Sequence, residues 1–360
     1  FELLNGYGVI HHGALLRFLP LLEVGYCNRN PYHTQVHAAD VCNAMYFLLT
    51  GIGFWDHDNF TDSKQISVIL AGLGHDLGHI GRSNGFFIAT WHTLATTYND
   101  RSVLENFHVA SLFRLIDQDR NDHSAEAQDG GGLSMLERFS SESYTKVRKL
   151  IVALILATDT QYHLESLAEF RIRLSALDSW AASDGLELTF DPLGQTTDQQ
   201  QALMLMFRAA DIGHSAKRWP LHQVWSQRIT EEFHHQGDEE RKLGLPISPL
   251  CDRHNFDLAA SQIGFLNFIC LPTWTAIARF ETLMEFLFAV EALTDGDDTG
   301  ASAAPKSLRS QKSQKSPTAA KSKGSAKSVR DCLHECERNL EEWTAATENR
   351  PQLASARSGV

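Results

Sequence analysis

The stretch "ISVILAGLGHDLGHIG", residues 66–81, joins an apolar run to two histidines and an aspartate within five positions. Adjacent residues point about 100° apart on a regular helix, so His75 and Asp76 can face one ion only where a helix ends. Such a bend is supported by three glycines, Gly74, Gly78 and Gly81. We therefore predict a buried helix that ends in a metal-binding turn.

Most of the remaining sequence has the periodicity of helices. Residues 36–53 and 144–177 place apolar side chains at i, i+3 and i+4 spacing, and alternating segments typical of strands are nearly absent. We expect an all-α fold, a compact multi-helix arrangement in which residues 1–360 form a single domain.

Composition and charge narrow the possible partners and compartment. Hydrophobic residues make up 43% of the 360 residues, and the net charge of −12 argues against a nucleic-acid partner. The six cysteines form no C-x2-C pair, and we interpret them as reduced thiols of a cytoplasmic protein. No run approaches the ~18 apolar residues of a membrane span. Because the chain begins with Phe1, we interpret it as a fragment, and an upstream anchor would place it on the cytosolic face of a membrane.

A basic, Ser- and Lys-rich segment from about Thr299 to Arg330 interrupts the helical pattern. It carries eight Lys or Arg residues and no acid, and it cannot bury a core, so we expect a disordered insertion before the last helix. Two interpretations remain open: a solvated insertion, or a contact for anionic lipid or an acidic partner.

Further histidines and a distant aspartate could complete a metal site together with His75 and Asp76. His33 and His37 are four residues apart at the start of a helical run, and Asp211 ends another apolar helix. Imidazole nitrogens and carboxylate oxygens suit zinc at one position and a harder ion such as magnesium at the next.

The ordered series resembles the HD superfamily of metal-dependent phosphohydrolases and, within it, the catalytic domain of class I cyclic nucleotide phosphodiesterases. The matching segments are "NPYHTQVHAADV", "LGHDLGHIGRSNGF", "YNDRSVLENFH", "ILATDTQYH", "ADIGHSAKRW", "WSQRITEEFHHQGDEER", "ISPLCDRH" and "SQIGFLNFICLP". They run from about Tyr26 to Cys270, and the last helix resumes at Val329. The residues "HIGRSN" are similar to those of the phosphodiesterases of apicomplexan parasites.

The resemblance implies a two-metal hydrolase that acts on cAMP, cGMP or both. Its implied zinc ligands are His37, His75, Asp76 and Asp211. Asp76 would also bridge to a second ion, magnesium or manganese. A hydroxide between the two ions would attack the cyclic phosphodiester, and the bond to O3′ would break to give the 5′-monophosphate.

The same resemblance assigns roles around the metals. His33 is the implied general acid that protonates O3′, and Glu105 is the carboxylate implied to orient it. Residues that match positions next to the second ion are His79, His108 and Thr158, with Asn84 and Asp159 lining the metal pocket.

The base pocket is implied to come from the C-terminal half. Gln262 would hydrogen-bond the purine edge, and its amide can both donate and accept. The implied clamp and its surroundings comprise Phe265, Ile229, Phe233, Tyr32 and His214.

Three departures from the family pattern are Thr34 after the acid histidine, Ile80 in the metal loop and His214 three residues after the last metal aspartate. His214 leaves the preference between cAMP and cGMP open, and the sequence does not indicate an oligomeric state. Two alternatives remain: an HD-type phosphohydrolase of other nucleotides, which would not need Gln262, and a non-enzymatic nucleotide sensor, which would not need His33.

Overall fold

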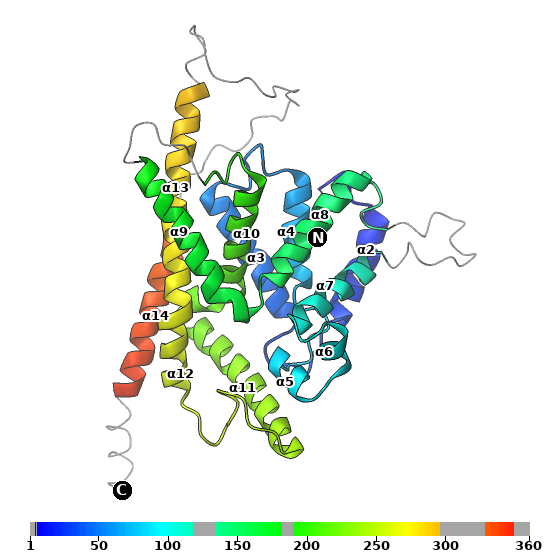
Figure 1. The fold of residues 1–360 in the computed structure, drawn as a ribbon, viewed down its shortest axis with the longest axis vertical. Helices are drawn as coiled ribbons and strands as arrows, with labels where there is room; N and C mark the ends of the chain where they lie inside the picture. The colour runs from blue at the N-terminus through cyan, green and yellow to red at the C-terminus, as the bar shows by residue number, and fades with distance from the viewer. Residues whose placement is uncertain (1–3, 5, 118–133, 182–189, 296–327, 349–360) are drawn as a thin grey trace, which may run out of the picture.

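The computed structural model describes residues 4, 6–117, 134–181, 190–295 and 328–348, and it is built from helices (Figure 1). Its helices are α2 (His12–Val24), α3 (Gln35–Ile52), α4 (Asp62–Gly74), α5 (Asn84–Ala89), α6 (Thr93–Thr97), α7 (Val103–Ile116), α8 (Ser141–Leu156), η3 (Thr160–Tyr162), α9 (His163–Ala181), α10 (Thr196–Asp211), η4 (Gly213–Ala216), α11 (Trp219–Leu243), α12 (Leu258–Phe265), η5 (Leu266–Cys270), α13 (Leu271–Asp295) and α14 (Arg330–Glu348). No strand occurs within the described ranges, so the all-α expectation is confirmed.

Helix α4 is a central helix of the fold. Ile66 and Leu70 are fully buried, because α4 packs against α3 on one side and α8 on another. Gly72 allows the close approach of α3, since a Cβ added there would lie 3.0 Å from the Cα of Cys42. The apolar run that the sequence places before residue 74 therefore holds the end of α4 in the interior.

Helix α10 passes through the same core and contacts α3, α8, α9 and α13. Its Met206 and Phe207 are fully buried, and Leu154 of α8 is buried in the same hydrophobic cluster. Both α4 and α10 end next to the beginning of α3, and this convergence positions the polar site described below.

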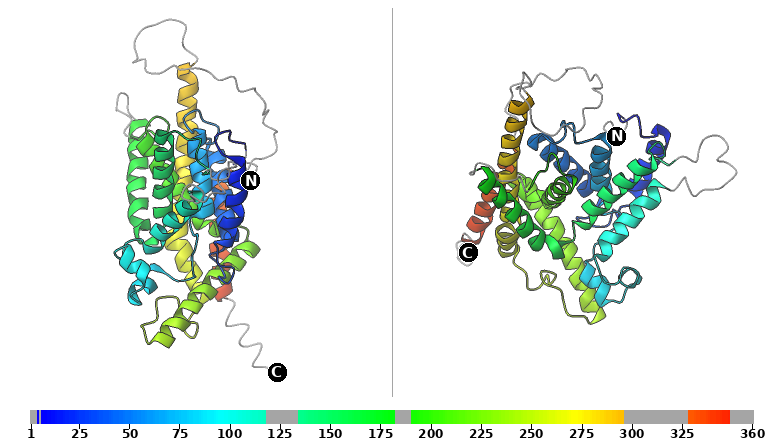
Figure 2. Two further views of the ribbon diagram at one scale, coloured as in Figure 1. Left: turned by 90° about the vertical axis from the view of Figure 1, so that its right-hand side faces the viewer. Right: turned by 45° about the horizontal axis from the view of Figure 1, so that its top comes forward.

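The C-terminal helices form one side of the molecule. Helices α13 and α14 lie side by side, and α11 runs along the lower part of the molecule as drawn (Figures 1 and 2). The helical stretch Leu258–Ala289 has the length and apolar composition of a membrane-spanning helix, which the sequence analysis did not expect. In this fold 39% of its apolar segment is buried, and α13 packs on α9, α10 and α14.

The predicted basic insertion lies almost entirely outside the described residues. The described chain stops at Asp295 in α13 and resumes at Ser328, two residues before α14 begins. The proposed contact with lipid or an acidic partner stays a prediction.

Candidate active site

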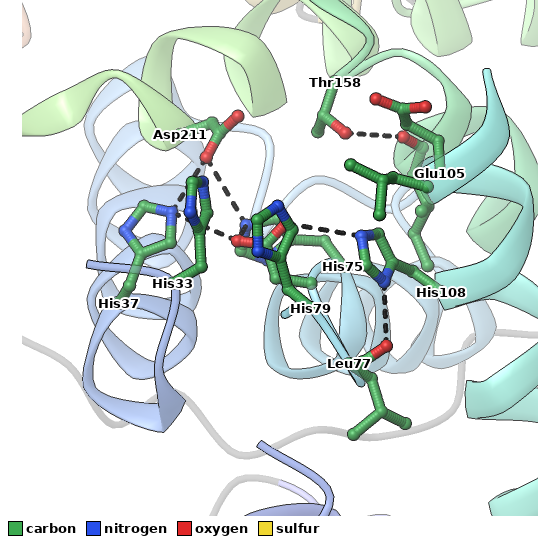
Figure 3. A network of polar contacts seen from close by, with 12 residues as sticks. His33, His37, His75, Leu77, His79, Glu105, His108, Thr158 and Asp211 are labelled. Atoms are coloured by element: carbon green, nitrogen blue, oxygen red, sulfur yellow. Dashed lines mark hydrogen bonds and ion pairs between the residues drawn. The ribbon is translucent and has the colours of Figure 1, made fainter. Parts of the chain in front are cut away.

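Three elements far apart in the sequence bring four polar side chains together (Figure 3). His37 lies in the first turn of α3, and Asp211 is the last residue of α10. His75 follows the last residue of α4, and Asp76 comes next. One ligand atom from each of the four lies within 4.8 Å of the others, so the structure gathers all the residues that the resemblance assigns to zinc.

The atoms of this cluster have the arrangement of a cation site. Nε2 of His37 lies 3.0 Å from Oδ1 of Asp211, and Nε2 of His75 lies 3.4 Å from the same oxygen. Nε2 of His75 is also 3.0 Å from Oδ2 of Asp76, but both atoms are buried without a hydrogen-bond partner. Buried polar atoms without a partner destabilise a fold, and two imidazole nitrogens with two carboxylate oxygens fit a divalent cation such as zinc.

The charges of the cluster also fit a cation site. Burial raises the pKa of Asp211, but the hydrogen bond from His37 and the nearby imidazole of His75 lower it more, so the pKa falls well below its usual range. Burial lowers the pKa of His75, but Asp76 and Asp211 outweigh it and raise the pKa well above normal. Without a cation, a proton on His75 balances the carboxylates, and metal binding would release that proton.

The turn after α4 aims His75 at the cluster. Nδ1 of His75 donates to the carbonyl of Gly72 at 3.0 Å, which leaves Nε2 free to face the other ligands. Gly78 and Gly81 have φ values of +80° and +72°, a region that favours glycine, as the predicted bend requires. Gly74 has a different role, because a Cβ there would lie 2.7 Å from Leu112.

A second group of polar residues lies on one side of this turn (Figure 3). Nε2 of His108 is 4.0 Å from Oδ1 of Asp76, and its Nδ1 donates to the carbonyl of Leu77 at 2.8 Å. Burial is the main cause that raises the pKa of Glu105 to about 7; a hydrogen bond from Asn84 opposes the change and the charge of Asp159 adds to it. Buried negative charge of this kind suits a second divalent cation, which would lower that pKa.

The remaining residues of this group are fixed by hydrogen bonds. Asn84 donates to Glu105 at 2.9 Å and accepts from the amide of Leu104 at 2.8 Å. Ser102 donates to Asp159 at 2.7 Å, and the hydroxyl of Thr158 donates to the carbonyl of Ile155 at 2.8 Å. These bonds set the positions of the side chains without a ligand present.

The structure corrects the carboxylate assigned to His33. Nδ1 of His33 pairs with Oε1 of Glu232 on α11, whereas the partner described for the Glu105 carboxylate is Asn84. Burial lowers the pKa of His33, but Glu232 and Asp76 raise it more, to about 9. His33 also stacks on His79, with ring centroids 3.9 Å apart. The carboxylate that orients His33 is therefore Glu232.

Sequence reasoning passed over Glu232 although it named both Ile229 and Phe233. A signal was present, because Glu232, Gln236 and Glu240 are spaced four residues apart on α11 and all are buried. A helix face with buried polar side chains at this spacing indicates hydrogen-bonding partners on a neighbouring element.

The predicted base-pocket residues lie close to this centre. Gln262 is buried, and its Oε1 accepts a hydrogen bond of 2.9 Å from Ser226 of α11. The ring of Phe265 is stacked on His214, with centroids 5.8 Å apart and planes 13° apart. Tyr32 is 6.1 Å from His214, again between ring centroids. Ile229 and Phe233 are half-buried and follow Ser226 on α11 by about one and two turns.

A buried network connects His214 to the last helix, and the sequence analysis did not foresee it. His222 on α11 donates through Nδ1 to the carbonyl of His214 at 3.1 Å. Nε2 of His222 accepts from the indole of Trp343 at 2.8 Å. Asn339 of α14 donates to the carbonyl oxygens of Ser215 and Lys217 at 2.9 and 2.8 Å. Helix α14 therefore supports the segment that carries His214.

Comparison with known families identifies the fold and site together. A family model described as 3′5′-cyclic nucleotide phosphodiesterase matches residues 32–291, which include all the polar residues gathered above except those of α14. The chain belongs to this family. The predicted class I phosphodiesterase catalytic domain is thereby confirmed.

Individual phosphodiesterases show the extent of the similarity. The probable 3′,5′-cyclic phosphodiesterase pde-1 of Caenorhabditis elegans is 38% identical over 279 residues, covering 76% of this chain and 37% of the relative. The dual specificity calcium/calmodulin-dependent 3′,5′-cyclic nucleotide phosphodiesterase 1C of Mus musculus is 35% identical over 285 residues, 77% of this chain and 36% of the relative. The chain thus spans well under two thirds of these curated relatives.

A solved structure supports the fold. The phosphodiesterase domain of the RhoPDE fusion protein from the choanoflagellate Salpingoeca rosetta has a TM-score of 0.70 and 24% identity. The match covers 95% of this chain and 86% of that structure. The helical architecture of phosphodiesterase catalytic domains is therefore shared along nearly the whole chain.

Proposed function

We propose that this chain hydrolyses 3′,5′-cyclic nucleotides to 5′-monophosphates at the cluster of His37, His75, Asp76 and Asp211. The strongest support is that this cluster lies next to the hydrogen-bonded pair of His33 and Glu232. The cluster also has buried atoms without a hydrogen-bond partner. A cation site next to a protonated histidine suits the cleavage of a phosphodiester, because the phosphate needs charge stabilisation and the leaving oxygen needs a proton.

The proposed cofactors are zinc at the four-residue cluster and magnesium or manganese on the side of Glu105 and His108. Two nitrogen and two oxygen donors suit zinc, whereas the charges of Asp159 and Asp76 near Glu105 suit a harder cation. Such cations would polarise the phosphate and lower the pKa of bound water. The protein's part is to hold Asp76 within reach of both positions, as its 4.0 Å separation from His108 allows.

His33 is the proposed proton donor. Its pKa of about 9 keeps it protonated at neutral pH, because the nearby carboxylates outweigh its burial. Since Nδ1 is held by Glu232, Nε2 is the nitrogen available to protonate O3′. After the transfer, the Nδ1 proton remains on the Glu232 side, so the ring keeps its orientation.

Both cAMP and cGMP are proposed substrates. The hydroxyl of Ser226 donates to Oε1 of Gln262, but a serine hydroxyl rotates and can equally accept from the amide nitrogen. Gln262 can therefore present either its NH2 group or its oxygen to the purine edge. The stacked ring of Phe265 offers one apolar face to either base.

The direct test is a side-by-side assay of the purified chain on cAMP and cGMP with added zinc and magnesium or manganese. We expect turnover of both, and a fall of about 10²- to 10⁴-fold for His33→Ala. Absence of turnover on either nucleotide, with both metals demonstrably bound, would refute the proposal and favour a nucleotide sensor.

A second variant separates this activity from that of another HD-type phosphohydrolase. Gln262→Ala should raise KM for both cyclic nucleotides, because the purine edge loses its partner in the pocket. If the kinetics of Gln262→Ala are unchanged, the better candidate substrate is a nucleotide whose base the pocket does not recognise. Including 5′-monophosphates and triphosphates in the assay identifies it.

A further inference from the structure

A groove at the N-terminal end of α4, the end away from the active site, has a distinct chemistry. It lies between the start of α4, the first half of α8 and the segment that leads into α10, and its volume is about 570 Å³. The residues that line it are Asn59, Thr61, Ser63, Lys64, Ser67, Ser143, Lys146, Val147, Lys149, Leu150, Leu193, Gly194, Gln195, Thr196, Gln199, Gln200 and Leu203. This volume is within the range of small-molecule sites.

The charge of the groove is opposite to that of the chain. All three charged residues in its lining are lysines, Lys64, Lys146 and Lys149, in a chain whose net charge is −12. Within the described part of the chain, no ion pair is formed by Lys64 or Lys149, while Lys146 pairs with the exposed Glu142 at 2.7 Å. Exposed pairs of this kind are weak, so the groove keeps an excess of positive charge.

Two neutral hydrogen-bond acceptors hold Lys64 in place at the groove, so its positive charge is not neutralised. Its Nζ donates to the carbonyl of Asn59 at 2.8 Å and to the amide oxygen of Gln199. Burial, and then the charge of Lys146, lower the pKa of Lys64. An anion between the two ammonium groups would relieve this repulsion.

The ends of two neighbouring helices add hydrogen-bond donors to the groove. Helices α4 and α10 both begin at the groove, and their N-caps, Thr61 and Gln195, make no side-chain cap hydrogen bond. The backbone N–H groups of their first turns add positive potential, although Asp62 and Asp198 in the same turns offset part of it. Asp198 is engaged by Arg173 at 2.6 Å and does not line the groove.

Buried aliphatic side chains form the base of the groove. Val147, Leu150, Leu193 and Leu203 are all among its lining residues and are buried. Leu150 and Leu193 keep the largest exposed fractions of the four, 9% and 7%, so a molecule with a phosphate and a small apolar or aromatic part would match both kinds of lining.

We propose that this groove is a binding site for a small phosphorylated molecule, with its phosphate on the lysines and its apolar part over Leu150 and Leu193. The site is separate from the proposed catalytic centre. Helix α4 has 13 residues, so at ~1.5 Å per residue its N-terminal end lies roughly 20 Å from His75. The proposal does not depend on the proposed hydrolase activity.

Pyridoxal 5′-phosphate is a suitable probe, because it combines phosphate, an aromatic ring and an aldehyde. The amine of a lysine condenses with the aldehyde to an imine and releases water, and borohydride reduces the imine by hydride transfer, with a proton from water, to a stable secondary amine. Peptide mapping by mass spectrometry of the metal-loaded full chain then shows which lysine has reacted. No lysine is among the proposed catalytic residues, so the label distinguishes the two sites.

We expect Lys64 to be labelled about tenfold faster than Lys242, an exposed lysine at the end of α11 outside the groove. Pyridoxal, which lacks the phosphate, should show little of this preference. Inorganic phosphate should protect Lys64 and leave Lys242 unprotected. Equal preference with pyridoxal, and no protection by phosphate, would overturn the proposal, since the reactivity would then come only from the low pKa of Lys64.

A matched pair of charge reversals completes the test. Lys149→Glu places a carboxylate in the groove without removing a hydrogen bond that the structure describes, and it should abolish phosphate protection of Lys64. Lys242→Glu should leave protection unchanged. If Lys149→Glu fails to fold, Lys149→Gln serves instead, with a severalfold weaker protection expected. Protection that is identical in the Lys149 variants and the native chain also overturns the proposal.

Discussion

At the scale of single residues, Glu232 accepts three hydrogen bonds from the proposed acid His33 and its neighbour Tyr32. Its Oε1 pairs with Nδ1 of His33, and its Oε2 accepts the backbone N–H groups of Tyr32 and His33 at 3.0 and 3.1 Å. One carboxylate thus fixes both the backbone and the ring of His33. The proton on His33 and the position from which it leaves therefore depend on the same side chain.

Glu232→Gln should lower kcat by about 10- to 100-fold while leaving the metal content unchanged. Glutamine keeps one oxygen for the two backbone amides but removes the negative charge next to His33. Because that charge raises the pKa of His33, its loss should shift the alkaline limb of the pH–rate profile to lower pH. The measurement is the pH profile of kcat with parallel metal analysis.

The matched control for this variant is Glu105→Gln. Glu105 bonds Asn84 and faces the proposed second cation, so we expect it to change the magnesium dependence and not the alkaline limb. An alkaline limb that moves with Glu105→Gln and stays in place with Glu232→Gln would restore the original assignment of Glu105 as the partner of His33.

At the scale of secondary-structure elements, the periodic sequence predicts much of what is observed. The apolar run before Gly74 predicts a buried helix, and the end of α4 lies where the glycines and the His-Asp pair indicate. The start of α3 differs from the expectation, because the helix begins at Gln35 and leaves His33 in a bend. Asn30 and Glu232 bind the backbone of that bend, and such tertiary contacts override the local periodicity.

The parts that could not be predicted are those in which one helix face meets another. Glu232, Ser226, His222 and Trp343 acquire their roles only through partners distant in the sequence. A single sequence shows which helix faces are apolar, but it does not show which of them pack together. The proposed metal ligands can be identified by resemblance because they lie in three short segments, each with its own local pattern.

Helix α14 is the clearest case of such a tertiary role, and it predicts a pH-dependent stability. Neutral His222 donates through Nδ1 to His214 and accepts from Trp343 through Nε2, so a second proton would break the bond to Trp343. Burial lowers the pKa of His222 to about 4, from an ordinary value near 6.5. Its contribution is therefore complete above pH ~6.5 and is lost as the pH falls towards 4.

Between pH 7.5 and 5.5 this histidine should account for a loss of about 1 kcal/mol in the free energy of unfolding. His222→Gln keeps an oxygen acceptor for Trp343 but does not titrate, so the variant should lose less stability over the same interval. Urea denaturation of both proteins at the two pH values measures the difference, and other buried histidines cancel in it. The same loss in both proteins would contradict the assignment to His222.

At the scale of the whole molecule, the proposed metal cluster joins the N-terminal turn of α3 to the C-terminal ends of α4 and α10. These helices also form the hydrophobic core, which contains Met45, Leu70 and Phe207. The core places one ligand atom from each of four polar side chains within 4.8 Å of the others, and two of these side chains have buried atoms that lack a hydrogen-bond partner. These buried polar atoms destabilise the fold, and a cation bound between them would remove that cost.

Removal of metal should therefore lower the stability of the entire domain. A cation that binds only the folded chain at about 1,000 times its Kd contributes about 4 kcal/mol, so a chelator should lower Tm by several degrees and re-addition of zinc should restore it. The control is Asp211→Asn, which removes one proposed ligand from the end of α10 and should respond less to the chelator. Thermal unfolding followed by circular dichroism, with metal content measured in parallel, gives both values. Native protein that contains zinc and loses it to the chelator without a change in Tm would show that the four side chains do not hold that ion, because a ligand bound to the folded state alone must stabilise it.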